Sequence, residues 1–305
     1  MRIMVKVKLA ALAGAAGALA TLVALPAPAQ AHIQLFVPCS ATALRNAINQ
    51  ANTLPGPDTL FLTPGCTYTL TAADNPGNGL PQVTTDVNII GNGSTVRRQS
   101  ATDFRIIKVS GTGGRLTLNN LTVCDGRSAS GGEGGGGIAA GLGTTLTLNP
   151  VEVTRNFAGV TGPGGGIVSF GALTLRNSTV SYNISTHNGG GIYTYGTTNI
   201  SNSTITGNTA KDDGGGMDTR GSLTLTNSRV TENAARFGGA GINAYQLTGT
   251  ITDTLIRGNS AAENDGGGLY NRDSTLTLNG PPSSPTGPSA AARPAAAWAT
   301  LPARP

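Results

Sequence analysis

The sequence is poor in the residue types that most enzymes use for chemistry. Only 11% of its 305 residues are charged, and it has two histidines, His32 and His187. It contains no combination typical of a Ser/His/Asp triad, no zinc-ligand spacing and no nucleotide-binding motif. The sequence therefore gives little support to a familiar hydrolase, zinc enzyme or nucleotide-dependent enzyme.

Positive charge is also scarce once the amino terminus is set aside. The chain has 20 Lys and Arg against 15 Asp and Glu, but Arg2, Lys6 and Lys8 lie in a segment that we expect to be removed. The remaining chain is then nearly neutral, without the clustered basic face that nucleic-acid binding requires. We expect no nucleic-acid partner.

Helical periodicity is nearly absent, and what the sequence has instead is glycine, 45 residues in all, arranged in a repeat. Glycine triplets or pairs are followed by an apolar residue at regular intervals, and the three middle intervals are 25 residues each. The apolar positions are Ile138, Ile167, Ile192, Met217, Ile242 and Leu269. Repeat periods of about 20–50 residues are typical of solenoids.

Each repeat contains three short runs of the β-branched and aromatic residues that strands prefer. In one repeat the runs are Ile192–Tyr195, Thr198–Ser201 and Thr204–Thr206, separated by the Gly and Asn residues typical of turns. This pattern predicts an all-β fold, a single-stranded parallel β-helix with coils of about 25 residues. Parallel crossovers are overwhelmingly right-handed, so we expect a right-handed coil.

Alternation within the runs predicts which side chains fill the coil. Leucines two residues apart point to the same face of a strand, as at Leu173 and Leu175. The same spacing recurs at Leu223 and Leu225 and at Leu276 and Leu278, and Val180, Ile205, Val230 and Ile256 join them in the predicted core. A second periodic series, Asn183, Asn208, Asn233 and Asn259, suits left-handed turns and a ladder of amide hydrogen bonds along the axis.

Residues 1–31 have the features of a secretory signal peptide: a basic start, the apolar stretch Leu9–Leu25 and the cleavage motif Ala29-Gln30-Ala31. A retained membrane anchor is the alternative, although an Ala-rich segment of this length inserts weakly. We expect a secreted, extracellular protein with no membrane association after signal removal.

Residues 32–58 carry the one helical pattern, and we interpret them as an N-terminal cap. Ser40 is a candidate N-cap, and Ala43, Leu44, Ala47, Ile48 and Ala51 form an amphipathic stripe. Solenoids need a cap over the first coil. Cys39 and Cys66 flank this segment and are the candidate disulfide, worth roughly 3 kcal/mol by loop-closure entropy. Other pairings with Cys124 remain open, although we expect Cys124 to be a buried small residue.

The coils are expected over residues 59–279, roughly nine in number under the repeat logic. At residues 280–305 the sequence becomes rich in Pro and Ala, which predicts a disordered tail. The β pattern breaks off in mid-coil at Leu278, which is the pattern expected from a truncation or a shifted reading frame.

Several motifs carry a resemblance to a known family. The stretch CSATALRNAINQANTLPGPDTLFLTPGCTYTL, the segment LPQVTTDVNIIGNGSTV and the GGGI…LTLxNSxVxxN repeats resemble a family of secreted right-handed parallel β-helix proteins from actinobacteria, over about residues 39–279. More distantly the coils resemble pectin-lyase-like enzymes and adhesin repeats. The resemblance implies export and the β-helix fold.

If the apolar residue after the glycines points inward, the next residue and the one two further on point outward. These positions form what we call the tyrosine stripe: Tyr193, Tyr195, Asp218, Arg220, Asn243, Tyr245, Tyr270 and Arg272. Tyrosine rings stack on the CH faces of sugars, and the polar residues between them can meet hydroxyls. The stripe predicts a non-catalytic carbohydrate- or cell-envelope-binding, adhesin-like module, unless the rings simply cover the sheet.

The alternative function is a polysaccharide lyase or glycoside hydrolase. A calcium-dependent lyase would use Asp218, Arg220 and Arg272, and only under this alternative do we expect a cofactor, Ca²⁺. The order of motifs found in inverting pectin hydrolases is missing. A third class, ice binding, requires a flat and regular threonine array, which the aromatic stripe does not supply. We expect a monomer.

Overall fold

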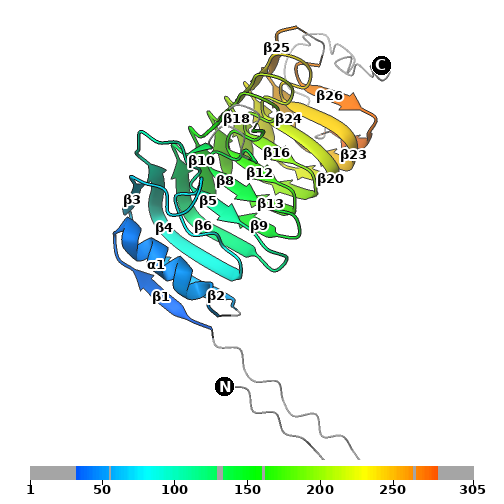
Figure 1. The fold of residues 1–305 in the computed structure, drawn as a ribbon. Helices are drawn as coiled ribbons and strands as arrows, with labels where there is room; N and C mark the ends of the chain where they lie inside the picture. Colours follow the sequence, from blue (N-terminus) through cyan, green and yellow to red (C-terminus); the bar gives the residue numbers. More distant parts are fainter. Residues whose placement is uncertain (1–31, 55, 129–132, 160–161, 264–265, 281–305) are drawn as a thin grey trace, which may run out of the picture. The chain divides into compact units, whose positions relative to one another are not determined.

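The computed structural model describes residues 32–280 except 55, 129–132, 160–161 and 264–265, all within one compact unit. The signal peptide expected at 1–31 and the tail expected after Gly280 lie outside the described residues. The fold is an all-β parallel solenoid of about nine turns, which confirms the fold class and the coil count. Figure 1 shows the strands of successive coils lying side by side.

The central coils contribute strands to three long parallel ladders, which we call the first, second and third faces. The first face contains the strand that follows the glycines: β5 (Ile107–Val109), β8 (Ile138–Ala140), β12 (Ile167–Ser169), β16 (Ile192–Thr194), the starts of β20 (Met217–Thr226) and β23 (Ile242–Thr252), and β26 (Leu269–Arg272). The second face contains β1 (Gln34–Val37), β2 (Asp58–Leu62), β4 (Asp86–Arg98), β6 (Arg115–Cys124), β9 (Thr145–Leu148), β13 (Ala172–Arg176), β17 (Thr197–Ser201), the remainders of β20 and β23, and β27 (Thr275–Asn279).

The third face contains β3 (Thr67–Leu70), the ends of β4 and β6, β10 (Val151–Thr154), β14 (Thr179–Ser181), β18 (Thr204–Thr206), β21 (Arg229–Thr231) and β24 (Leu255–Arg257). A separate sheet of two-residue strands follows it: β7 (Arg127–Ser128), β11 (Phe157–Ala158), β15 (Ile184–Ser185), β19 (Thr209–Ala210), β22 (Ala234–Ala235) and β25 (Ser260–Ala261). The sequence did not predict this fourth ladder, because two residues are too few to show alternation.

The predicted core fills the bore of the solenoid. Leu173, Leu175, Val180 and Ile205 are each fully buried. In the last described coil the prediction of a buried pair is wrong, because Leu276 is only half-buried and Leu278 is 42% exposed. Both lie at the end of the described coils, where a hollow of about 240 Å³ borders Leu278.

A ladder of buried asparagines runs along the axis, as the sequence predicted. Asn208 accepts hydrogen bonds from the backbone N–H and the side-chain Nδ2 of Asn183, at 2.9 and 3.0 Å. Its own Nδ2 donates to the carbonyl of Val180 at 2.9 Å and to Oδ1 of Asn233 at 3.0 Å. Asn156 and Asn259 extend the ladder in both directions. Amides that donate and accept at every step satisfy the backbone groups that a buried turn would leave unpaired.

The left-handed turns are not at the ladder asparagines themselves, so that part of the prediction is wrong. They occupy the residue before each one, for example Tyr182 (φ 53°) and Glu232 (φ 56°). A second series of left-handed residues includes Asn177 and Asn202, the asparagines of the two Asn-Ser-Thr motifs. Their backbone conformation explains why asparagine recurs there, since it tolerates this region better than most residues.

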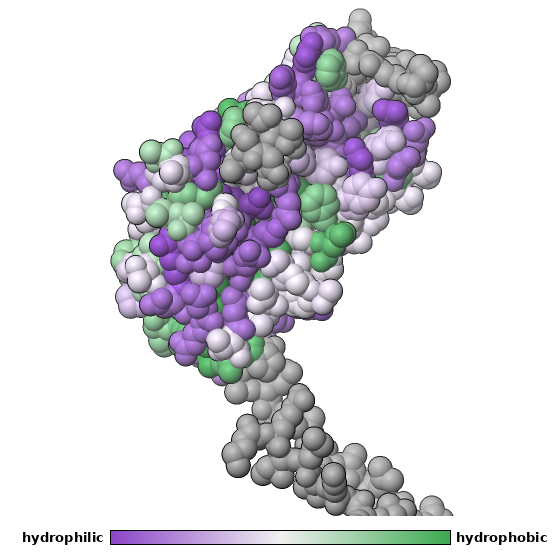
Figure 2. Space-filling model, in the orientation of Figure 1, coloured by the Kyte–Doolittle hydropathy of each residue, from purple (hydrophilic) through white to green (hydrophobic). Residues whose placement is uncertain are grey.

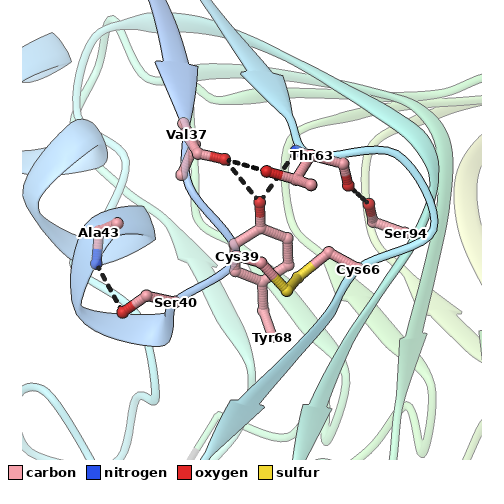
Figure 3. The surroundings of a disulfide bond; sticks show 8 residues. All are labelled: Val37, Cys39, Ser40, Ala43, Thr63, Cys66, Tyr68 and Ser94. Carbon is pink, nitrogen blue, oxygen red and sulfur yellow. Dashed lines mark hydrogen bonds between the residues drawn. A yellow bond between two sulfur atoms is a disulfide. The ribbon is translucent and has the colours of Figure 1, made fainter.

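The N-terminal cap is helix α1 (Ala41–Ala51), which contacts β1, β2 and β3. As predicted, Ser40 is the N-cap and accepts from the backbone N–H of Ala43 at 3.5 Å. Cys39 and Cys66 form a disulfide that ties the start of the helix to the first coil (Figure 3). Beside it the buried Tyr68 hydroxyl donates to the carbonyl of Val37 at 2.9 Å.

Strand β1 was not predicted, and it places part of the segment assigned to the cap within the second face. Its four residues pair in parallel with β2, so the sheet begins before the helix rather than after it. Within the described residues, no helix combines the length and the hydropathy needed to span a bilayer.

Candidate functional site

The tyrosine stripe lies on the first face, where four consecutive coils bring most of its residues into register, with a register shift at Arg220. Tyr193 pairs with Asp218, Asp218 with Asn243, and Asn243 with Tyr270. Tyr245 pairs with Arg272 in the second row. The inward neighbours Ile192, Met217, Ile242 and Leu269 are all buried, so the stripe residues point away from the bore.

The glycines before each strand fold back over the first row of the stripe. Gly189 and Gly214 have left-handed backbones, with φ of 67° and 69°. A Cβ at Gly214 would lie 2.7 Å from the carbonyl oxygen of Met217 and 2.8 Å from the backbone nitrogen of Asp218. Any side chain there would collide with the strand, so this turn can approach so closely only with glycine. The repeated glycines therefore serve to cover the row that contains Asp218.

This cover explains an outcome that alternation alone does not predict: Asp218 and Asn243 point outward and are nevertheless buried, with 0% and 5% exposure. Oδ2 of Asp218 accepts hydrogen bonds from Nδ2 of Asn188 and Nδ2 of Asn243, both at 2.8 Å. Arg220 lies on the other side, with its Nε 3.8 Å from Oδ1 of Asp218. Burial raises the pKa of Asp218 to about 6, against the two amide hydrogen bonds and the charge of Arg220, which lower it.

Arg220 is the centre of an aromatic cluster. Its guanidinium carbon lies 4.8 Å from the ring centroid of Tyr245 and 5.7 Å from those of Tyr193 and Tyr195. The Tyr245 ring also contacts a second arginine: the guanidinium carbon of Arg272 lies 4.9 Å from its centroid. Distances below about 6 Å are those of cation–π contacts. Burial raises the pKa of the Tyr193 hydroxyl, and the charge of Arg220 opposes the rise.

The parts of the stripe that reach the surface are the rings and the guanidinium groups. Tyr195 is 51% exposed, and the side chains of Arg220 and Arg272 are 28% and 36% exposed. Tyr245 and Tyr270 are half-buried. The accessible surface is therefore aromatic and cationic, while the carboxylate of Asp218 lies beneath it.

Several buried polar atoms in this region make no hydrogen bond, although Nε of Arg220 and Oδ1 of Asp218 are ion-pair partners. Nine buried side-chain atoms in the described residues make no hydrogen bond, and five of them belong to the strands of the stripe or the residues between its members. These five are Oδ1 of Asp218, Nε of Arg220, Oδ1 of Asn243, Oδ1 of Asn271 and Nε of Arg272. Buried polar groups are nearly always paired in folded proteins, so these atoms have hydrogen-bonding capacity that water or a ligand can use.

Sequence reasoning missed Asn188, which holds Asp218 from the turn of the preceding coil. Asn188 stands directly before the glycines of its repeat, and Asp213 occupies the same place in the next one. The two are linked along the axis: the backbone N–H of Asp213 donates to Oδ1 of Asn188 at 3.4 Å, and Oδ1 of Asp213 accepts from the N–H of Gly238 at 2.8 Å. The available signal was the polar residue directly before the glycines in two successive repeats, Asn188 and Asp213.

Other chemistry was sought around the stripe. In the part of the chain that the structure describes, no three His, Cys, Asp or Glu side chains come together as a metal-binding group. His187 lies outside the stripe, with its Nε2 3.7 Å from Oδ2 of Asp212. Comparisons of the chain with protein-family models, with curated proteins and with solved structures found no match.

Proposed function

We propose that this chain is a secreted extracellular scaffold whose tyrosine stripe binds a carbohydrate or a cell-envelope polymer without catalysis. The observation that carries the proposal is the coincidence, in the same strands, of tyrosine rings gathered around Arg220 and of five buried polar atoms that make no hydrogen bond. A sugar offers both kinds of contact, because its CH face stacks on aromatic rings and its hydroxyls donate and accept hydrogen bonds.

The arrangement favours an extended ligand. The stripe continues over four coils, from Tyr193 to Tyr270, with a rise of about 4.8 Å per coil. The stacked guanidinium groups of Arg220 and Arg272 hold the tyrosine rings in place, so little side-chain entropy is lost when a ligand binds. A polymer lying along the solenoid axis would meet tyrosine rings and arginine side chains in turn, because Tyr195, Arg220, Tyr245 and Arg272 come from four successive coils.

Catalysis is the second candidate, and one observation favours it: Asp218 has a raised pKa and lies beside Arg220, a combination found at functional sites. A general acid or base must, however, reach the proton that it transfers. Asp218 has no exposed surface, and its Oδ2 is already occupied by hydrogen bonds from Asn188 and Asn243. We therefore place Asp218 in the support of the stripe and not among groups that would touch a substrate.

The fold and the sequence motifs also support a proposed family assignment. We infer that the chain belongs to the secreted actinobacterial right-handed β-helix proteins, within the pectin-lyase-like superfold. The parallel coils and the N-terminal cap support this. Export through removal of residues 1–31 and a right-handed coil are part of the same proposal.

The proposal is tested by retention of the purified protein on immobilised polysaccharides. We expect the double variant Tyr195→Ala/Tyr245→Ala to bind about tenfold more weakly, since each aromatic contact contributes roughly 0.5–1.5 kcal/mol. Tyr182→Ala is the matched control, because Tyr182 is 63% exposed and lies outside the stripe. Equal loss in the control and the stripe variant would overturn the proposal, as would the absence of retention for the unmodified protein on every polysaccharide.

A further inference from the structure

A second surface of the solenoid carries a regular array that the tyrosine stripe does not involve. We call it the threonine face: the outward residues of β17, the second-face parts of β20 and β23, and β27. These four coils supply twelve outward positions, occupied by eight threonines, two serines and two asparagines. They are Thr197, Asn199 and Ser201; Ser222, Thr224 and Thr226; Thr248, Thr250 and Thr252; and Thr275, Thr277 and Asn279.

The register of the strands makes this a two-dimensional grid. Three rows run along the axis without interruption: Thr197–Ser222–Thr248–Thr275, Asn199–Thr224–Thr250–Thr277 and Ser201–Thr226–Thr252–Asn279. Members of a row are about 4.8 Å apart, and outward neighbours on one strand are about 6.6 Å apart. Hydroxyl and methyl groups therefore repeat in both directions at fixed intervals.

The composition of the grid is specific to this face. On the third face of the same coils, the outward residues Thr204, Arg229 and Leu255 form one row and Thr206, Thr231 and Arg257 the next. Half of those six positions are charged or apolar. The first face has tyrosine and arginine at its outward positions. A general preference of strands for threonine would act on all three faces, so it does not account for twelve uncharged small polar side chains on one.

The grid rests on buried side chains under three of its four strands, whereas beneath β27 Leu276 is half-buried and Leu278 is 42% exposed. Beneath it, the inward residues Thr198, Ile200, Leu223, Leu225 and Ile251 are buried with at most 4% exposure. The strands are paired on both sides from β17 to β23, so their outward side chains cannot shift independently along the axis. Eight of the twelve grid residues are exposed, and the other four are half-buried.

We propose that the threonine face binds the surface of an ice crystal. The hydroxyls hold water by hydrogen bonds, and the methyl groups restrict the orientation of the water between them, so a fixed grid imposes a fixed arrangement on its first water layer. Each contact is weak, but many contacts presented at once by one rigid face give strong attachment to a solid that repeats in the same way.

Other occupants fit this face less well. Sugar polymers are recognised through aromatic stacking, and the grid has no aromatic residue. Protein partners anchor on buried aromatic, arginine and apolar side chains, which the grid also lacks. Figure 2 shows purple and pale residues over most of the coloured surface in this view, with green patches between them.

The test is the inhibition of ice recrystallisation by the purified chain, together with the freezing-point hysteresis of the same samples. The central variant Thr224→Tyr projects a ring above the grid, and we expect it to raise the concentration needed for inhibition at least about tenfold. Thr248→Tyr, in the next coil and an outer row, is a second variant of the same kind. Thr204→Tyr is the matched control on the third face and is expected to keep full inhibition.

Thermal unfolding followed by circular dichroism checks that each variant is folded. Inhibition by the unmodified chain that is lost in the two grid variants and kept in Thr204→Tyr would support the proposal. The proposal would be overturned if ice grains grew as fast with the unmodified chain as with serum albumin at equal concentration. Equal loss in the third-face control, or retention on crystalline cellulose without any effect on ice, would also overturn it.

Discussion

Replacing Asn208 by alanine removes the centre of the buried asparagine ladder, and its cost can be worked out from the contacts. The side chain is fully buried and takes part in four hydrogen bonds, two accepted from Asn183 and two donated to Val180 and Asn233. The backbone N–H of Asn183 loses its partner, which costs about 1–3 kcal/mol for a buried donor. The other three contacts contribute roughly 0.5–1.5 kcal/mol each.

The expected loss is therefore about 4 kcal/mol, a large part of the 5–15 kcal/mol that typically separates folded from unfolded domains. The assay is urea unfolding followed by far-ultraviolet circular dichroism. Asn259→Ala, at the half-buried end of the ladder, should cost about 3 kcal/mol, since Asn259 accepts two hydrogen bonds from Asn233 but donates only to the carbonyl of Val230. Asn199→Ala, at an exposed position, should change stability by less than about 0.5 kcal/mol.

The reasoning would be refuted if Asn208→Ala lay within about 1 kcal/mol of Asn199→Ala, a difference too small for the loss of a buried network. Such a result would mean that packing of the apolar bore alone holds the coils together, and that the ladder contributes to the choice of turn rather than to stability.

Three further predictions concern titrating and sulfur-bearing groups. Because burial raises the pKa of Asp218 from 3.8 to about 6, the folded state keeps a proton that the unfolded chain has released. This contribution to the free energy of unfolding is complete below pH 4 and is lost as the pH rises through 6, by up to roughly 3 kcal/mol. Asp218→Asn should remove this pH dependence. Parallel plots of unfolding free energy against pH for the two proteins would contradict the prediction. The double variant Cys39→Ala/Cys66→Ala should lower the free energy of unfolding by roughly 3 kcal/mol in the same urea assay, and an unchanged midpoint would show that the loop is held without the disulfide. Burial raises the pKa of the Cys124 thiol to about 12, so iodoacetamide should label it only after unfolding; rapid labelling of the folded protein would count against its burial.

Much of the architecture could be predicted from the sequence because one pattern repeats in every coil. The 25-residue interval gave the solenoid, and leucines two apart gave the bore, since a two-residue period places both on one face. Ser40 and the stripe from Ala43 to Ala51 gave the helix. Strand β1 was not predicted because it precedes the first repeat and has only four residues.

The candidate site was predicted less completely. Alternation correctly placed Tyr193, Asp218 and Asn243 in one outward row, yet it carries no information on what covers that row. The cover depends on the left-handed glycines, whose close approach only the three-dimensional structure shows. The threonine face was not predicted for a different reason: alternation along one strand, as at Thr248, Thr250 and Thr252, shows one direction of the grid, and only the pairing of successive coils shows the other.

The most direct test of the proposed binding function is a polysaccharide array probed with the purified protein, with and without calcium, and read for retention and for released reducing or unsaturated ends. Retention without released ends is the predicted result, and it should not depend on calcium. Released ends would contradict the non-catalytic assignment and would require Asp218, Arg220 and Arg272 to be reconsidered as catalytic groups. If the array shows no retention and no released ends, that result would contradict carbohydrate binding by the tyrosine stripe for every polymer on the array.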